Sequence, residues 1–437
     1  MMQNWIAQNK VRPGTYVNVV SEAKPQGAIS ERGTVTMALS LSWGPSGEVM
    51  EIQAGENTLD KLGYDISEPQ ILLVQEALKR AKTLLLYRLN TGSKAQATSD
   101  NLTVAALYGG VRGNDITVVV EQDIDDETTF IVKTLVAGSN VDNQLAKKIE
   151  DLKANKFVTF SGTGALVASA GIPLTGGTDG TETGVNHTAY REAIELHDFD
   201  AMAVPYDDPT IKSVYVAFAK RLANQQNRFI QIVVPNYALA DDPTVISVSN
   251  GVILSNSTVI DAVKATAWVA GATAGANANQ SLTHTAYDDA VAVHGRLNDS
   301  QITKALLNGE FLFEQHNGKV VVEQDINTFT SFSPDKRKHF SKNRVVRTIN
   351  GVVKDWKRAF DSDYLGKINN NDDGRNLYKK ECIKIVEEYQ AMGAIQNFDA
   401  QKDIIVSPGN DSDSLLTEGY IQPVDAMEKN YLKAVVR

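Results

Sequence analysis

Short apolar runs alternate with amphipathic helical patterns in two stretches of this chain of 437 residues. The run at 84–89 follows a helical pattern over 70–82. Farther along, runs at 201–205 and 229–235 flank a helical pattern over 209–224. Parallel strands need a long crossover, and a helix is the usual one. The alternation therefore predicts the α/β fold class, with a mostly parallel sheet covered by helices on both faces.

A polar, β-rich stretch separates these two parts and is interpreted as an inserted domain. Strands are expected at 116–121 and 130–135 on either side of an acidic turn. A short helix is predicted at 143–155 and a strand at 156–161. A Gly-Gly-Thr-Asp-Gly run at 176–180 marks the return to the central domain.

The second part of the central domain is expected to end in a hairpin. Helices are predicted at 189–196, at 259–267 and from about Thr285, where Asp288 has capping-box spacing. Asn317-Gly318 then separates two apolar runs, and this dipeptide accepts the positive φ angles of a type I′ turn.

Two amphipathic helical patterns dominate the C-terminal hundred residues. The chain is accordingly divided into six parts: an N-terminal extended arm (1–33), the first part of the central domain (34–90), the inserted β-rich domain (91–176), the second part of the central domain (177–330), an α+β C-terminal domain (331–420) and a C-terminal extended arm (421–437).

Composition limits the function classes. The single cysteine, Cys382, excludes an intramolecular disulfide and every multi-cysteine metal site. The first residues lack the pattern of a signal peptide, and the most apolar stretch, 252–276, is interrupted by Asp261 and Lys264, so no membrane insertion is expected.

No motif for catalysis, cofactor binding or metal binding stands out, and none of these sites is predicted. A Gly-x-Ser-x-Gly elbow and a phosphate-binding Gly-Lys-Ser/Thr run are both missing. Residues 369–374 begin like a calcium loop, but Lys380 occupies the position of the bidentate Glu, so a polar turn between helices is favoured. His187 and His197, like His284 and His294, are ten residues apart, which is too far along a helix for both to bind one ion.

Charge is unevenly distributed. The chain has 43 Lys and Arg against 53 Asp and Glu, a net charge of −10. Residues 333–384 hold fourteen of the basic and seven of the acidic side chains, so this segment is +7 and the rest is −17. An anionic partner for this segment is the sharper interpretation, and a set of solvated helix faces is the alternative.

Several motifs together resemble the contractile tail sheath proteins of phages, defective prophages and phage-tail-like bacteriocins. The matching segments are Arg-Pro-Gly-Thr-Tyr-Val at 12–17, the Gly-rich run at 176–180 with Tyr190, Trp-Val-Ala-Gly-Ala-Thr-Ala-Gly at 268–275 with Ser281, Thr283, Tyr287 and Ala290, the run at 320–328, and Gln-Pro-Val-Asp-Ala-Met-Glu-Lys-Asn-Tyr at 422–431. The resemblance covers nearly the whole chain.

This resemblance implies a central domain of subtilisin-like topology without protease function, and an inserted domain that varies between members. It implies hexameric rings stacked around an inner tube, with neighbours joined by exchanged terminal strands. The residues expected in these inter-subunit arms are Tyr16, Val17, Val19, Val20, Tyr431, Leu432, Val435 and Val436. Contraction would drive the tube through a bacterial envelope, using energy stored in a metastable extended assembly.

The resemblance also implies partners: other copies of this chain, the inner tail tube protein, and the baseplate and tail terminator proteins, without direct contact to nucleic acid. The basic residues expected to face an acidic tube are Lys354, Lys357, Arg358, Arg375, Lys379, Lys380 and Lys384. Assembly is expected in the bacterial host cytoplasm, with release of the virion or phage-tail-like particle by lysis. Two other hypotheses stay open: a hydrolase on the α/β domain, and a nucleic-acid-binding module using the basic segment.

Overall fold

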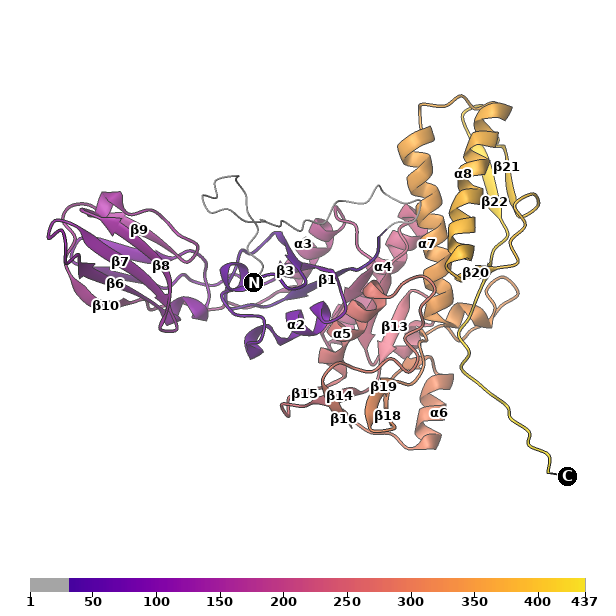
Figure 1. Ribbon diagram of the computed structural model, residues 1–437, viewed down its shortest axis with the longest axis horizontal. Coiled ribbons are helices and arrows are strands. Elements are labelled where there is room, and N and C mark those ends of the chain that lie inside the picture. The colour runs from indigo at the N-terminus through magenta and orange to yellow at the C-terminus, as the bar shows by residue number, and fades with distance from the viewer. Residues whose placement is uncertain (1–30, 437) are drawn as a thin grey trace, which may run out of the picture.

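A seven-stranded sheet forms the centre of the protein, whose computed structural model describes residues 31–436 (Figure 1). The strand order is β17-β13-β12-β11-β1-β3-β2. These strands are β1 (Thr34–Leu39), β2 (Val49–Gln53), β3 (Thr83–Arg88), β11 (Ala201–Ala203), β12 (Gln231–Pro235), β13 (Val245–Val248) and β17 (Glu310–Phe311). All neighbours pair in parallel except β2 with β3, which confirms the predicted mostly parallel sheet.

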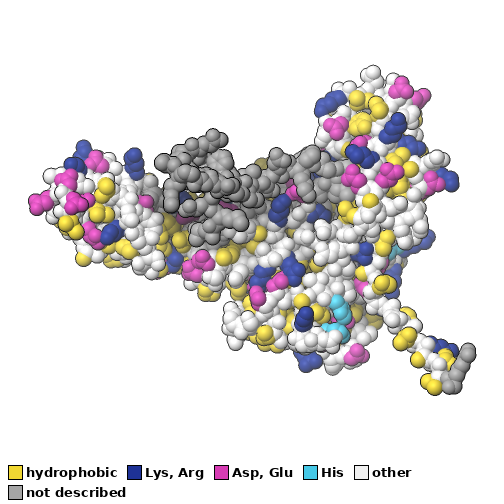
Figure 2. Space-filling view, in the orientation of Figure 1, with side chains coloured by type: hydrophobic (Ala, Val, Ile, Leu, Met, Phe, Trp, Pro, Cys, Tyr) yellow, Lys and Arg dark blue, Asp and Glu magenta, His cyan; other side chains and the backbone are white. Residues whose placement is uncertain are grey.

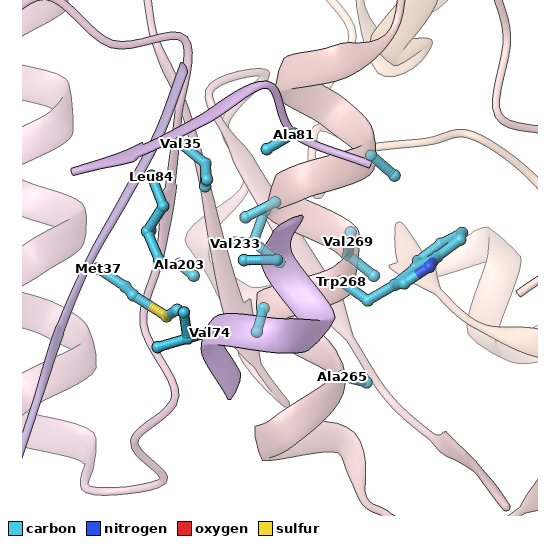
Figure 3. Packing of buried hydrophobic residues seen from close by; sticks show 14 of the residues in the cluster. Val35, Met37, Val74, Ala81, Leu84, Ala203, Val233, Ala265, Trp268 and Val269 are labelled. Carbon is cyan, nitrogen blue, oxygen red and sulfur yellow. The ribbon is translucent and has the colours of Figure 1, made fainter. Parts of the chain in front are cut away.

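Helices cover both faces of this sheet, as predicted. Helices α2 (Leu72–Leu78) and α5 (Ala262–Gly275) pack on one face, and α3 (Gly184–Ile194) and α4 (Pro209–Gln226) pack on the other. Figure 3 shows Val74 of α2 near Met37 of β1, Trp268 and Val269 on α5, and Val35 and Leu84 on the strands. A Cβ atom on Gly271 would lie 2.2 Å from the carbonyl oxygen of Ala77, so only glycine permits this approach of α5 to α2.

The inserted domain is a β-sandwich at one end of the molecule (Figure 1). One sheet contains β10 (Ser169–Pro173), β6 (Ile116–Gln122), β7 (Phe130–Val136) and β8 (Ser139–Ala146), and the other contains β4 (Gln96–Ser99), β5 (Leu102–Ala106) and β9 (Val158–Gly162). The chain enters and leaves it at one place, where Ser93 and Thr178 exchange two hydrogen bonds: the Ser93 amide donates to Thr178 Oγ1 (3.1 Å) and the Thr178 amide donates to the Ser93 carbonyl (3.2 Å).

The predicted helix at 143–155 is wrong. Residues Asn143 to Ala146 belong to β8, which pairs along its length with β7, and only Ile149–Asp151 form a 3-10 turn. The backbone hydrogen-bonding groups of this segment pair with those of β7, which precedes it in the chain. This pairing overrides the local helical composition of the segment.

The predicted helix near Thr285 is also wrong. His284 and Asp289 have positive φ angles of 58° and 62°, and the amides of His284 and Tyr287 donate to carbonyls of the following hairpin. A strand, β16 (Ala290–His294), follows and pairs with β14 (Gly251–Leu254), which also pairs with β15 (Val259–Ile260).

Three neighbouring elements complete the central domain. Helix α5 begins at Ala262 rather than at 259, because the Asp261 side chain accepts a hydrogen bond from the Lys264 amide. Helix α6 (Asp299–Leu307) was not predicted. The hairpin of β18 (Phe313–His316) and β19 (Lys319–Val322) is confirmed, with φ of 49° at Asn317 and 78° at Gly318.

The C-terminal domain pairs α7 (Asn343–Ala359) with α8 (Asp372–Ala391) at the other end of the molecule (Figure 1). A hairpin of β21 (Ile404–Pro408) and β22 (Leu415–Gly419) packs on α8, and β20 (Ile395–Gln396) pairs with β23 (Gln422–Pro423). Asn371 Oδ1 accepts a hydrogen bond from the Gly374 amide (2.9 Å) at the start of α8. A polar turn therefore precedes α8, as predicted.

Candidate inter-subunit surfaces

The C-terminal segment leaves the body of the protein after β23 and extends away from it (Figure 1). Its apolar side chains are almost fully exposed: Tyr431 (91%), Leu432 (87%), Val435 (71%) and Val436 (96%). Residues with large apolar side chains are rarely left in water as a run, and such a run marks an interaction site. The structure thus places four of the predicted arm residues where another chain can reach them.

Glu428 fixes the point at which this segment leaves. Its carboxylate lies against the Lys342 ammonium, accepts a hydrogen bond from Gln324 Nε2 (2.5 Å) and accepts another from Thr283 Oγ1 (2.9 Å). Burial raises the pKa of Glu428, but the hydrogen bonds from Lys342 and Gln324 outweigh burial and leave this pKa below its usual value. The carboxylate is therefore held in its charged form.

The predicted N-terminal arm residues Tyr16, Val17, Val19 and Val20 lie outside the described residues. The point where the N-terminal segment joins the central sheet is described, and there Asp200 is the key residue. Its Oδ2 accepts hydrogen bonds from the amides of Gly33 (2.9 Å) and Thr34 (3.2 Å), and its Oδ1 lies 3.5 Å from the Arg32 guanidinium.

Sheet edges in the described part of the chain differ in how open they are. At the edge of the central sheet, Lys61 Nζ donates to the outward carbonyl of Glu51 (2.7 Å) in β2, so a side chain already covers this edge. In residues 31–436, β21 and β22 pair only with each other and leave two edges of five residues each. Unpaired strand edges of this kind can accept strands from another chain.

Three of the basic residues predicted to face a tube have partners within the chain. On α7, Lys354 lies 3.7 Å from Asp200, Lys357 Nζ donates to the Gln226 carbonyl (3.2 Å), and Arg358 lies 3.3 Å from Asp355. These three contacts are made within the chain, two of them with the central domain.

On α8 the basic residues are more accessible. Arg375 pairs with Asp372 (2.5 Å) and Lys384 with Glu381 (3.7 Å), whereas Lys379 is half-buried and Lys380 is exposed. Figure 2 shows Lys and Arg interspersed with Asp and Glu over the visible face of these helices. The excess of basic residues in the sequence therefore gave no indication that acidic side chains lie among them on this face.

A serine, a carboxylate and a histidine meet at the carboxyl ends of β1 and β11, where the strand order of the central sheet reverses. Ser40 Oγ donates to Glu182 Oε2 (2.5 Å), and Glu182 Oε1 lies 3.9 Å from His187 Nε2. His187 Nδ1 is bonded to the Tyr215 hydroxyl (2.8 Å). In the catalytic triad of a serine hydrolase, the histidine ring is hydrogen-bonded directly to the serine hydroxyl. Here the carboxylate separates the two, so the group does not form a catalytic triad.

The other histidines do not form a metal centre in the described residues. No group of three or more His, Cys, Asp or Glu side chains there is arranged to hold a metal ion. His284 instead lies beside His316, with ring centroids 4.9 Å apart. No helix in residues 31–436 is long and apolar enough to cross a membrane.

Sequence reasoning missed Glu428 and Asp200 as the residues that hold the two terminal segments. Glu428 stood in the motif at 422–431, but its partners lie 86 to 145 residues earlier in the chain. Asp200 precedes the apolar run at 201–205 and had no distinguishing neighbour. An acidic residue directly before an apolar run was the only signal in the sequence, and it does not identify partners.

Four family models match consecutive parts of the chain. They are described as the tail sheath protein Gp18 domain III N-terminal region (32–89), the phage tail sheath protein beta-sandwich domain (90–179), the phage tail sheath protein central domain (180–328) and the phage tail sheath C-terminal domain (335–437). The second of these matches the inserted β-sandwich.

Whole-length relatives agree with these matches. The phage-like element PBSX protein XkdK of Bacillus subtilis is 38% identical over 98% of each chain. The crystal structure of a sheath tail protein from Desulfitobacterium hafniense is 50% identical, with a TM-score of 0.86 over 95% of this chain and 98% of that one. The contracted helical sheath of the anti-feeding prophage shares the fold, with 12% identity and a TM-score of 0.58 over 97% and 98% of the two chains.

Membership in this family also decides the question of enzymatic activity, because tail sheath proteins are structural. The expectation of no enzymatic activity is confirmed on that ground. The chain belongs to the phage tail sheath protein family and is a structural sheath subunit of a contractile tail.

Proposed function

We propose that subunits of this chain stack as hexameric rings around an inner tail tube and are joined by exchanged terminal strands. The observation that carries this proposal is the exposed apolar C-terminal segment, which is held at Glu428 and then leaves its own domain. The acceptor is the β21–β22 hairpin of a neighbour, since its edges are open in the described part of the chain. Added strands bind through main-chain hydrogen bonds and tolerate changes in subunit orientation.

A truncation after Lys429 tests this proposal. The shortened protein should fold normally, because residues 430–436 have no tertiary contacts that support the core. Co-expressed with its tube protein, it should give bare tubes by negative-stain microscopy. The substitution Lys433→Gln keeps the apolar residues of the segment and should give sheathed tubes. Sheaths of normal length from the truncated protein would overturn the exchange of C-terminal strands.

Contraction is proposed as a switch between two packings of the same folded subunit, with the extended form held as a metastable state by the tube and baseplate. The central, inserted and C-terminal domains keep their own cores in this switch, and the exchanged strands act as the joints. The proposed central topology is subtilisin-like, and the proposed division of the chain follows the six parts given above. Neighbouring components are the tube, baseplate and tail terminator proteins, in particles assembled in the host cytoplasm and released by lysis.

Contact with the tube is proposed for the basic residues of the C-terminal domain. Lys379 and Lys380 of α8, which are partly exposed and exposed, are the better candidates. Lys354, Lys357 and Arg358 of α7 already have partners within the chain, and so does Lys384 of α8. Exposed ion pairs contribute about 0–1 kcal/mol each. Many such pairs around a tube can hold a sheath and still separate together.

A further inference from the structure

Helix α7 contacts the points where both terminal segments leave the folded protein. We call these points the roots: Glu428 marks the C-terminal root, and Arg32, Gly33 and Thr34 with Asp200 mark the N-terminal root. Lys342, the residue at its N-cap, contacts Glu428 at the root of the C-terminal segment. Lys354 contacts Asp200, which binds Arg32, Gly33 and Thr34 at the root of the N-terminal segment. The two lysines are twelve residues apart on one helix, or about 18 Å along its axis.

The carboxylates at both roots are shielded from water, because the side chain of Glu428 is 11% exposed and that of Asp200 is 5% exposed. Their lysine partners, Lys342 and Lys354, are 15% and 37% exposed. Charge-assisted hydrogen bonds are stronger where water is excluded, and removing one partner there leaves a buried charge unpaired.

Between these two lysines, α7 is bonded to the central domain by buried polar side chains. Asn343 Nδ2 donates to Asp325 Oδ1 (2.9 Å), and Asn343 Oδ1 accepts from Gln231 Nε2 (2.9 Å). Arg347 Nη1 donates to the Gln280 carbonyl (2.7 Å), and Thr348 Oγ1 donates to the Ala278 carbonyl (2.9 Å). The helix is therefore held against the central domain along its length.

We propose that α7 is a rigid strut that couples the two inter-subunit arms, with Glu428 and Asp200 as the positioning residues that fix where each arm departs. This inference rests on the proposed exchange of arms. A pull on one arm then has a direct route to the other through about three turns of one helix. The positions of the subunits that the two arms join are thereby linked to each other.

The first test uses the monomeric full-length protein and needs no assembly. Hydrogen exchange followed by mass spectrometry should show at least about tenfold faster exchange at residues 424–428 in Lys342→Met, and at Gly33 and Thr34 in Lys354→Met. Each variant should affect only its own root. The matched control is Lys402→Met, because Lys402 is 82% exposed and pairs with Asp399 at 3.1 Å on the surface of the same domain. Unchanged exchange at either root would overturn the proposal.

A charge exchange distinguishes the ion pair from a general loss of packing. The double variant Lys342→Glu with Glu428→Lys should restore slow exchange at 424–428, at least in part, whereas Lys342→Glu alone should not. Absence of any restoration would contradict the role of the Lys342–Glu428 pair.

The second test measures coupling in the assembly, with sheathed length per tube as the readout. Both Lys342→Met and Lys354→Met should shorten or abolish the sheath, although each loosens a different arm, and Lys402→Met should not. Normal sheaths from variants with loosened roots would overturn the strut and leave the sheath function intact. Failure of the unaltered chain to exchange arms would instead contradict the proposed function, with the root contacts unaffected.

Discussion

Arg347 and Asp325 lie 3.6 Å apart, and their side chains are 0% and 1% exposed. This pair joins α7 to the segment that follows the β18–β19 hairpin. Asp325 also accepts hydrogen bonds from the Leu282 amide (3.0 Å) and from Asn343 Nδ2 (2.9 Å). Burial lowers the pKa of Arg347 to about 10, while the nearby Asp325 opposes that shift. The contact between the central and C-terminal domains is thus built on charge as well as on apolar packing.

Loss of the Asp325 carboxylate should be costly. Asp325→Ala leaves the Arg347 guanidinium buried without its counter-charge, and breaking a buried pair in this way costs about 3–5 kcal/mol. Urea unfolding should show that decrease in the free energy of unfolding. Lys402→Ala removes an exposed pair and should change this free energy by less than about 1 kcal/mol. Equal stabilities of the two variants would contradict the importance of the buried pair.

The approach of α5 to α2 predicts a second stability effect. Gly271→Ala places a methyl group 2.2 Å from the Ala77 carbonyl oxygen, so the helices must move apart, at about 1–3 kcal/mol. Gly184→Ala is the control, because a Cβ atom at Gly184 has no heavy atom within 4 Å. Thermal unfolding should show a lower Tm for Gly271→Ala only. A Tm equal to that of the control would show that the helices separate without cost.

Cys382 should be chemically inert in the folded protein. Its side chain is buried among the residues of α7 and α8, and burial raises the pKa of its thiol to about 12. Because the thiolate is the reactive form, iodoacetamide at pH 8 should leave the native protein unmodified by intact mass, and should modify it fully in urea. Rapid modification without denaturant would mean that the C-terminal domain opens readily.

Acid should release the C-terminal segment. The lowered pKa of Glu428 means that the folded state binds its proton less readily than the unfolded chain. The charged carboxylate stabilises the attachment of the C-terminal segment fully at pH values above the ordinary pKa of glutamate. This stabilisation is lost as the pH falls through the lowered pKa of Glu428.

A fluorophore on Tyr431→Cys provides the measurement, since Cys382 stays unlabelled. Its anisotropy should fall as the pH is lowered past the ordinary pKa of a glutamate side chain and through the lowered pKa of Glu428. In a Glu428→Gln background it should be low and nearly independent of pH. A pH response that persists in that background would assign the release to another group.

Reversal of charge on α8 tests the tube contact. Lys379→Glu with Lys380→Glu should leave the monomer folded and impair assembly on purified tubes, because repulsion from an acidic tube replaces attraction. Lys304→Glu with Lys319→Glu makes the same change in charge at exposed residues of the central domain and should assemble normally. Normal assembly of the α8 variant would remove this contact and leave the sheath assignment in place.

Elements that depend on local patterns were predictable from the sequence. The apolar run of β3, the helix at Pro209–Gln226 and the turn at Asn317-Gly318 each carry their own signal within a few residues. The segments at 143–155 and 284–289 do not, because hydrogen bonds to β7 and to the β18–β19 hairpin decide their conformation.

The candidate surfaces divide in the same way. Exposure of Tyr431 and Val436 follows from an apolar stretch after the last folded element. The contacts of Glu428 and Asp200 join residues far apart in the chain, so no local pattern specifies them. The count of basic residues in 333–384 likewise carried no information about which of them, such as Lys354, are used inside the subunit.

The hydrogen bonds between Ser93 and Thr178 join the two ends of the β-sandwich domain. The chain therefore leaves the central domain and returns to it at adjacent points, and the whole β-sandwich is equivalent to one long loop between them. A loop whose ends already touch can be replaced by a longer, shorter or unrelated folded unit with little effect on the rest of the chain. This junction is therefore a natural site for grafting: foreign domains inserted between residues 93 and 178 would be displayed in a regular array, one per subunit, along an engineered particle.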